Sequence, residues 1–188
     1  GAAAVVLAAR TARKLDAAER DIQALGQGTK VLKVITDIAD AAQCQALADG
    51  ALEAFGRIDV LFNSAYDPGS FEPIAQANLD GWRRAMDVNF FGTMQLTQAC
   101  VPAMIAAGGG AIVMIATMVE HKPLATQGGY GASKSALRSA TKHLALELGR
   151  HGIRVNSCHM GWMWGPAVEG YFAWQSGQKA YAVMVDNE

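Results

Sequence analysis

Gly128-Gly129-Tyr130-Gly131-Ala132-Ser133-Lys134 is the stretch that decides the fold. It begins a predicted helix in which Tyr130 and Lys134 are four residues apart, so both side chains lie on one helical face. A phenol ionises near pH ~10, and a neighbouring ammonium that favours the phenolate would bring its pKa into the range useful for general acid–base chemistry. Tyr and Lys also occur at this spacing on ordinary amphipathic helices, so the surrounding sequence decides between the two interpretations.

Two further polar residues stand at fixed positions before this stretch. Thr117 lies thirteen residues before Tyr130 and ends the apolar run Ala111–Thr117. Such a run is typical of a buried parallel strand, which would deliver the Thr117 hydroxyl to the carboxyl edge of a sheet. Asn89 lies in Met86-Asp87-Val88-Asn89, inside a long predicted helix where an Asn ordinarily faces solvent or bonds to the backbone.

Together these residues resemble the short-chain dehydrogenase/reductase family, whose signature is Tyr-x-x-x-Lys with an upstream Ser and an Asn. The resemblance implies that Tyr130 exchanges a proton with the substrate oxygen, and that Lys134 lowers the Tyr130 pKa and bonds to the nicotinamide ribose. Thr117 stands in the place of the family's Ser and would orient the substrate oxygen. Asn89 would hold a proton-relay water. We therefore expect these four residues to be catalytic.

Composition bounds the class of protein. The chain has 188 residues, of which 51% are hydrophobic and 18% charged, and its net charge is -1. This length suits one well-buried domain over 1–188. The mixed charges favour a small-molecule partner over nucleic acid or an anionic membrane. No apolar run approaches the roughly eighteen residues that a membrane helix requires, so no membrane span is expected.

The cysteines and histidines show no metal-ligand spacing. Cys44, Cys100 and Cys158 are far apart and odd in number, which favours reduced thiols and a cytoplasmic location. The four histidines are likewise scattered, so no bound metal is expected.

Apolar, β-branched runs alternate with helical patterns along the whole chain. This alternation predicts an α/β fold, a Rossmann-like doubly wound parallel sheet with helices on both faces. The expected strands cover residues 1–10, 31–38, 58–65, 111–117 and 153–157. The expected helices cover 11–25, 40–55, 81–107 and 128–148, with a capping box at Asp40–Gln43, a cap at Asp80 and a bend or end at Pro102.

No Gly-x-Gly-x-x-Gly or related glycine-rich turn occurs in the sequence. In the family, a run such as Gly1–Arg10 is the second strand, and the turn precedes it. We therefore expect a sheet that lacks the family's first strand with its phosphate-binding turn, and also its last strand.

The candidate cofactor residues lie at predicted strand ends. Arg10 follows the first strand and no acid stands there, which favours NADP(H) and leaves NAD(H) possible; an Arg at a strand end is also an ordinary solvated residue. Asp37 and Ile38 resemble the family's adenine-contacting pair, and Asp37 is equally suited to a turn. The resemblance further assigns cofactor contacts to a third-strand set and a fifth-strand set, which are Asn63, Ser64, Ala65, Gly161 and Met163.

The candidate substrate residues lie in loops beyond those strand ends. Tyr66 replaces a family Gly and begins a loop to Asn78 that we expect to border the substrate. Residues 162–188 are unusually aromatic and resemble the family's mobile lid; the alternatives are a core or a subunit surface. The substrate candidates are Tyr66, His121, Trp162 and Trp164, and an apolar, fairly bulky substrate is expected.

The expected function is hydride transfer between NADP(H), or NAD(H), and a secondary alcohol or ketone. The resemblance also implies a homodimer or homotetramer, because the long helices around Asn89 and Tyr130 pair across subunits in the family. Two alternatives stay open. One is a non-catalytic binding or regulatory relative, which Thr117, Met160 and Gly165 would support as departures from the family pattern. The other is a scaffold.

Overall fold

The computed structural model describes residues 1–177. Strands and helices alternate, which confirms the predicted α/β class. The strands are β1 (Ala4–Ala9), β2 (Lys30–Ile35), β3 (Val60–Asn63), β4 (Gly110–Thr117) and β5 (Ile153–Met160). The helices are α1 (Ala12–Ala24), α2 (Ala41–Phe55), α3 (Leu79–Met86), α4 (Thr93–Ala106), α5 (Gly128–Leu148) and α6 (Pro166–Gly177). The described residues also form four short segments: η1 (Ile74–Gln76), η2 (Asp87–Gly92), η3 (Met118–Glu120) and η4 (Gly149–His151).

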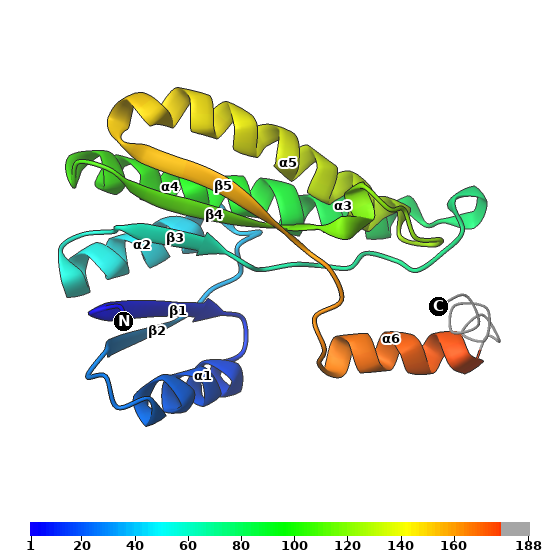
Figure 1. The fold of residues 1–188 in the computed structure, drawn as a ribbon, viewed down its shortest axis with the longest axis horizontal. Helices are drawn as coiled ribbons and strands as arrows, with labels where there is room; N and C mark the ends of the chain where they lie inside the picture. The colour runs from blue at the N-terminus through cyan, green and yellow to red at the C-terminus, as the bar shows by residue number, and fades with distance from the viewer. Residues whose placement is uncertain (178–188) are drawn as a thin grey trace.

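All strand pairs are parallel, as predicted. β1 pairs with β2, with Ala4 opposite Lys30, and β3, β4 and β5 form a second ladder in which Ile112 lies opposite both Leu61 and Val155. Figure 1 shows β1 between β2 and β3, so the strands follow the order β2, β1, β3, β4, β5. Within residues 1–177 no strand pairs with the facing edges of β1 and β3. The doubly wound sheet is therefore present in two pieces.

Helices cover the sheet in layers. α1 packs on β1 and β2, whereas α2 packs against α4, and α5 packs on β4 and β5 (Figure 1). Because the crossovers from β1 to β2 and from β2 to β3 run in opposite directions, a common right-handed sense places α1 and α2 on opposite faces. β3 is covered on one face only, since Leu61 and Asn63 are buried while Val60 and Phe62 are exposed. The main core lies between α2, α4, α5 and the three-stranded sheet, and includes Leu47, Leu96, Met104, Ile112, Met114 and Leu137.

The helix boundaries confirm one predicted cap and correct another. Asp40 caps α2 by accepting hydrogen bonds from the backbone N–H groups of Ala42 and Gln43 at 2.8 and 3.2 Å. The prediction of Asp80 as the cap of the next helix is wrong. α3 begins at Leu79, and the Asn78 side chain accepts from the Asp80 N–H at 2.9 Å. Asp80 instead lies in the first turn, where a carboxylate is favoured by the helix dipole.

The long helix predicted over 81–107 is continuous but not uniform. It runs through α3, a π-helical turn in η2, and α4, and it continues through Pro102 to Ala106. A π-turn shifts the backbone hydrogen bonds from i+4 to i+5 and often marks a functional position. Gly92 is the last residue of the π-turn, and a glycine is needed there because a Cβ would lie 2.7 Å from the backbone oxygen of Ile38.

The start of α5 depends on glycines that accept an indole ring. A Cβ on Gly129 would lie 2.7 Å from Trp82 Cγ, and one on Gly128 would lie 2.8 Å from Trp82 Cζ2. α3 and α5 therefore approach closely just before Tyr130, which fixes the helix that carries the predicted Tyr–Lys pair.

We expect Gly129→Ala to lower the free energy of unfolding by about 2 kcal/mol, because an added methyl in a packed contact forces the rigid ring to move. Gly131→Ala is the matched control on the same helix, since its Cβ would meet only Val119 Cγ1 at 3.5 Å. That control should be neutral or slightly stabilising, because Ala favours a helix over Gly. Urea unfolding measures both, and equal stabilities for the two variants would contradict the packing argument.

No helix within residues 1–177 is both long enough and apolar enough to span a lipid bilayer.

Candidate active site

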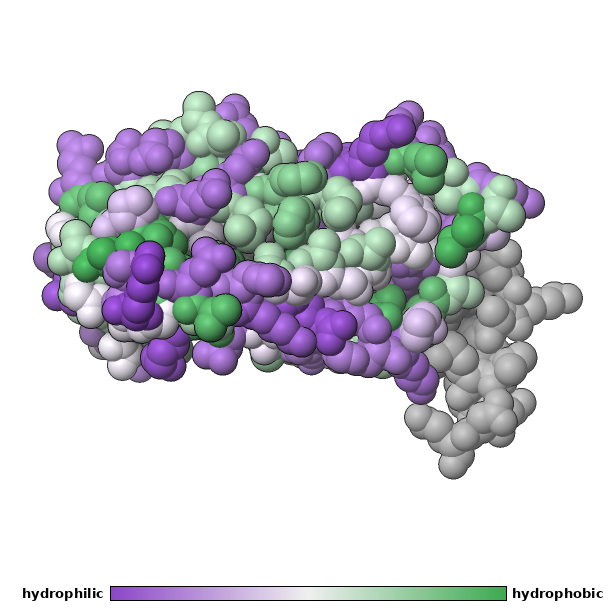
Figure 2. Space-filling model, turned by 90° about the horizontal axis from the view of Figure 1, so that it is seen from above, coloured by the Kyte–Doolittle hydropathy of each residue, from purple (hydrophilic) through white to green (hydrophobic). Residues whose placement is uncertain are grey.

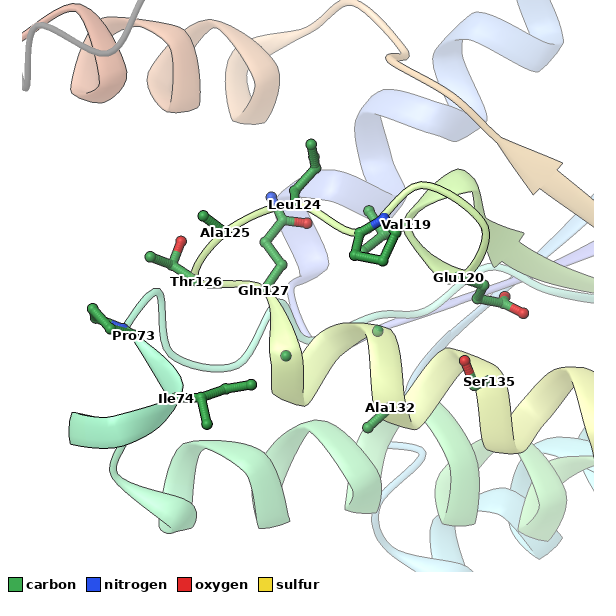
Figure 3. A pocket seen from close by; sticks show the side chains of 13 residues that line it. Pro73, Ile74, Val119, Glu120, Leu124, Ala125, Thr126, Gln127, Ala132 and Ser135 are labelled. Atoms are coloured by element: carbon green, nitrogen blue, oxygen red, sulfur yellow. The ribbon is translucent and has the colours of Figure 1, made fainter.

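A cavity of about 510 Å³ lies where the carboxyl ends of β3, β4 and β5 meet the start of α5. Thr117, Tyr130 and Lys134 all line it, so the fold brings three of the four predicted catalytic residues to one place. This edge is where parallel sheets ordinarily bind ligands. A second hollow of about 530 Å³ lies on the other side of Leu124 and Gln127, between the loop before α5 and the segment at Pro73 and Ile74 (Figure 3).

Thr117 is held at the end of β4 by a capping box. Its hydroxyl accepts a hydrogen bond from the Val119 N–H at 3.3 Å, and its own N–H donates to the Glu120 carboxylate at 3.4 Å. The side chain is buried and lies beside the Tyr130 phenol, whose pKa it lowers. The hydroxyl and the phenol are thus neighbours in the cavity, where both could contact one substrate oxygen.

Tyr130 stays protonated at neutral pH in this arrangement. Burial raises the pKa of Tyr130, the neighbouring Thr117 hydroxyl partly offsets that, and the nearby Tyr66 and Glu120 raise it further. The sequence led us to expect the opposite direction, with Lys134 lowering this pKa. The Lys134 ammonium instead donates to the Ile115 backbone oxygen at 2.7 Å.

Lys134 is itself an unusual lysine. It is 1% exposed, and burial lowers its pKa to about 8, with Glu120 opposing the shift. A buried ammonium near its ionisation point can be displaced from a backbone carbonyl by a ligand that offers hydroxyl acceptors.

Asn89 lies in the π-turn and is completely buried. Its amide oxygen accepts from the Asp67 N–H at 2.7 Å, and its amide nitrogen donates to the Asp67 oxygen at 2.8 Å and to Ser133 Oγ at 2.9 Å. Ser133 in turn donates to the Tyr130 backbone oxygen at 2.8 Å. The side chain therefore ties the loop after β3 to the helix that carries Tyr130 and Lys134.

Comparisons with known proteins identify this arrangement. Residues 1–176 match the family model described as short chain dehydrogenase. The chain belongs to the short-chain dehydrogenase family. It is 40% identical over 134 residues to an uncharacterized NAD-dependent oxidoreductase of Mycobacterium tuberculosis, covering 71% of this chain and 48% of that protein. It is 34% identical over 157 residues to a cyclohexanol dehydrogenase of Acinetobacter sp., covering 82% and 62%.

The fold comparison agrees with the sequence comparison. NAD+-bound xylitol dehydrogenase is 28% identical and superposes with a TM-score of 0.87, covering 92% of this chain and 66% of that one. The chain thus spans about half the length of the curated relatives that match it first. The match to a solved structure of the family extends over nearly all of this chain.

The predicted cofactor residues of this short-chain dehydrogenase fall into two groups. Asn63 and Asp37 have structural partners: Asn63 donates to Thr97 Oγ1 at 3.2 Å and to Met114 Sδ at 3.3 Å, and Asp37 accepts from the Ala39 N–H at 3.0 Å in a turn. The Ile38 oxygen lies against Gly92. The remaining candidates, exposed at strand ends, are Arg10, Ser64, Ala65, Gly161 and Met163.

The fit of these residues to a dinucleotide is partial. Ser64, Gly161 and Met163 line the same cavity as Tyr130 and Lys134, which suits a nicotinamide and its ribose. Arg10 forms no ion pair within residues 1–177 and remains available to an anion. The glycine-rich turn that would hold the pyrophosphate does not occur in the chain.

Two of the four predicted substrate residues line the cavity and two do not. Tyr66 lies edge-on to Tyr130, with ring centroids 6.5 Å apart, and Trp162 stacks on Tyr171 at 5.2 Å; both line the cavity. Trp164 is 75% exposed and stacks on Phe172, outside the cavity lining. His121 also lies outside it. Residues 178–188 of the predicted lid lie outside the described residues.

His121 belongs to a polar cluster that the sequence analysis missed. The Glu120 side chain is fully buried, with its carboxylate 2.9 Å from Arg138 Nε and 3.8 Å from His159 Nδ1, and the two histidine rings lie 5.1 Å apart. The side chains in this cluster that could ligate a metal ion are Glu120, His121 and His159. They come from η3, the following turn and β5, so no regular spacing in the sequence predicts the cluster. Thr117-Met118-Val119-Glu120 has the spacing of a capping box and could have revealed Glu120.

We expect Lys134 to make stability depend on pH above 8. Because its folded pKa is about 8 and its ordinary value is 10.5, the unfolded chain binds a proton that the folded chain has lost between these pH values. Stability from this group therefore rises as pH increases from about 8 to 10.5. Urea unfolding across this range should show the rise in the parent protein and not in Lys134→Met. Lys142→Met, at an exposed position of α5, should keep it; equal pH slopes for parent and Lys134→Met would contradict the burial argument.

Proposed function

We propose that the intact protein is a dinucleotide-dependent oxidoreductase that interconverts a neutral secondary alcohol and its ketone. The observation that carries the proposal is the placing of Thr117, Tyr130 and Lys134 in one cavity at the carboxyl edge of the sheet. The other lining side chains are mostly apolar, and Lys134 is the sole charged side chain among the described lining residues. An uncharged, largely apolar substrate fits such a cavity.

Each polar side chain has a distinct task in this proposal. Thr117 donates to the substrate oxygen and orients it, and Tyr130 gives that oxygen a proton in reduction or takes one in oxidation. Lys134 holds a ribose hydroxyl and provides positive charge. The nicotinamide supplies or accepts the hydride at C4. Asn89 holds the loop after β3 against α5. It would also bind a proton-relay water beside the π-turn.

For the cofactor we propose a preference for NADP(H). The support is Arg10 at the carboxyl end of β1, exposed, with no acid beside it in sequence. The relatives named for NAD favour the other nucleotide, so both belong in the test. The name of the cyclohexanol dehydrogenase supports small alicyclic alcohols as substrates.

The decisive experiment is fluorescence titration of the intact protein with NADPH and NADH, followed by turnover assays with a panel of cyclic ketones. Saturable binding together with ketone reduction is the expected result. Absence of binding to both nucleotides would refute the oxidoreductase and favour the non-catalytic binding protein or scaffold.

We also propose that the protein is a cytoplasmic homodimer or homotetramer. Seen from the side of α5, hydrophobic side chains form a band across the middle of the molecule, bordered by hydrophilic ones (Figure 2). Phe91 in η2 and Leu146 in α5 are 51% and 80% exposed. Apolar area of this kind often marks a protein interface. Light scattering of the intact protein measures the assembly.

A further inference from the structure

Gln127 is a buried polar residue that has no role in the proposed catalytic mechanism. It is 8% exposed and directly precedes α5, with backbone angles outside the helical range. Its side chain makes no cap and has no hydrogen-bond partner among residues 1–177. A primary amide has two donor hydrogens and one acceptor oxygen, and burying it without partners is costly.

The amide of Gln127 faces the cavities and is not sealed in the core. The fully buried side-chain atoms that lack a hydrogen bond among the described residues belong to Ser70, Gln95 and Glu120, and Gln127 is not one of them. Figure 3 shows its side chain extending from the start of α5 alongside Leu124. Gln127 and Leu124 together line both the active-site cavity and the adjoining hollow. The amide therefore remains open to a molecule bound in the active-site cavity.

The position of Gln127 relative to Tyr130 sets which part of a substrate it can reach. Both residues line the active-site cavity, and Gln127 directly precedes the helix in which Tyr130 is the third residue, so the two side chains border one cavity from neighbouring backbone positions. A substrate whose carbonyl oxygen meets Tyr130 would present to Gln127 an atom several bonds away. No acidic side chain and no base other than Lys134 lines the cavity within the described residues. A positively charged substrate group would therefore have no partner there, and in the proposed function Lys134 already bonds to the ribose.

We propose that Gln127 is a specificity-determining residue that hydrogen-bonds to a second, uncharged oxygen of the substrate. This inference rests on the proposed oxidoreductase function and deepens it: the preferred substrates are neutral hydroxyketones or diketones, and the corresponding diols, on an apolar frame. The alcohol or ketone centre reacts at Tyr130, and the second oxygen is held at Gln127 and is unchanged by the reaction.

The test compares two ketones of nearly equal shape, 4-hydroxycyclohexanone and 4-methylcyclohexanone, in the intact protein. We expect kcat/KM for the hydroxyketone to exceed that for the methylketone by about three- to tenfold, the usual worth of one net hydrogen bond. In Gln127→Met, which keeps the length of the side chain and removes the amide, this ratio should fall by about the same factor. Gln23→Met, at an exposed position of α1, is the matched control and should keep the parent ratio.

A binding measurement without dinucleotide gives a second readout. The Kd of each ketone, followed by tryptophan fluorescence because Trp162 lines the cavity, should show the same preference in the parent protein and lose it in Gln127→Met. A parallel fall for both ketones would mean that Gln127 only supports the structure, and would overturn the inference. So would dinucleotide binding with turnover of neither ketone. Failure to bind any dinucleotide would instead refute the proposed function itself.

Discussion

Tyr130→Phe is expected to lower kcat for ketone reduction by about a thousandfold in the intact protein, within the range that general acid catalysis supplies. In the proposed function the phenol is the proton donor, and the variant keeps the ring that packs edge-on to Tyr66. Dinucleotide affinity should change by less than about threefold, because the substitution leaves Lys134 in place. Steady-state kinetics and fluorescence titration measure the two quantities separately.

Tyr66→Phe is the matched comparison for this substitution. It removes a phenolic hydroxyl from the same cavity, but Tyr66 is 50% exposed and packs against Tyr130 by its ring. Its effect on kcat should stay below about tenfold. A Tyr130→Phe enzyme as active as Tyr66→Phe would remove Tyr130 from the proton-transfer step.

The raised Tyr130 pKa also predicts how the two directions depend on pH. Because the phenol remains protonated through neutral pH, reduction should be independent of this group there. Alcohol oxidation requires the phenolate, so its rate should rise with pH toward and above 10, the ordinary pKa of the group. A bound dinucleotide that draws Lys134 closer would move this rise to lower pH, which the pH profile of kcat would reveal.

Local sequence patterns predicted the parts of this fold that depend on local physics. The uninterrupted apolar run before Thr117 became β4, and Asp40 became the cap of α2, because burial and capping are determined by a few consecutive residues. The Tyr130 and Lys134 spacing placed both side chains in one cavity for the same reason.

The features that the sequence did not reveal depend on contacts between distant segments. The direction of the Tyr130 pKa depends on burial beneath the loop after β3 and on Lys134 finding the Ile115 oxygen instead of the phenol. His121 lies beside His159 because η3 and β5 end close together. Neither contact is indicated by a regular spacing of residues in the sequence.

The role of Asn89 shows how a family resemblance and a structure inform each other. The resemblance marked Asn89 as functional against the ordinary expectation for an Asn inside a helix. The structure adds a mechanical reason: the side chain saturates three polar atoms that come from two other segments. Asn89 lies in the π-turn and bonds to Asp67 in the loop, so the π-turn and the Asn89 side chain together hold this loop.

Asn89→Ala should therefore lower the free energy of unfolding by about 3 kcal/mol, since it removes three buried hydrogen bonds and leaves the Asp67 N–H and oxygen without partners. Asn156→Ala, at an exposed position of β5, should change stability by less than about 0.5 kcal/mol. Urea unfolding gives both values.

The same substitution tests whether Asn89 shapes the active site. Hydrogen exchange at the Asp67 amide should become much faster in Asn89→Ala, because that N–H now donates to the Asn89 oxygen at 2.7 Å. Tyr66 and Pro68 of the loop line the cavity, so the freed loop should also raise KM for cyclic ketones. Ser133→Ala removes one of the three hydrogen bonds while leaving both Asp67 contacts, and should disturb the loop less. Unchanged Asp67 exchange in Asn89→Ala would show that the loop is held by other contacts, such as those of the Asp67 side chain with Gly69 and Arg84.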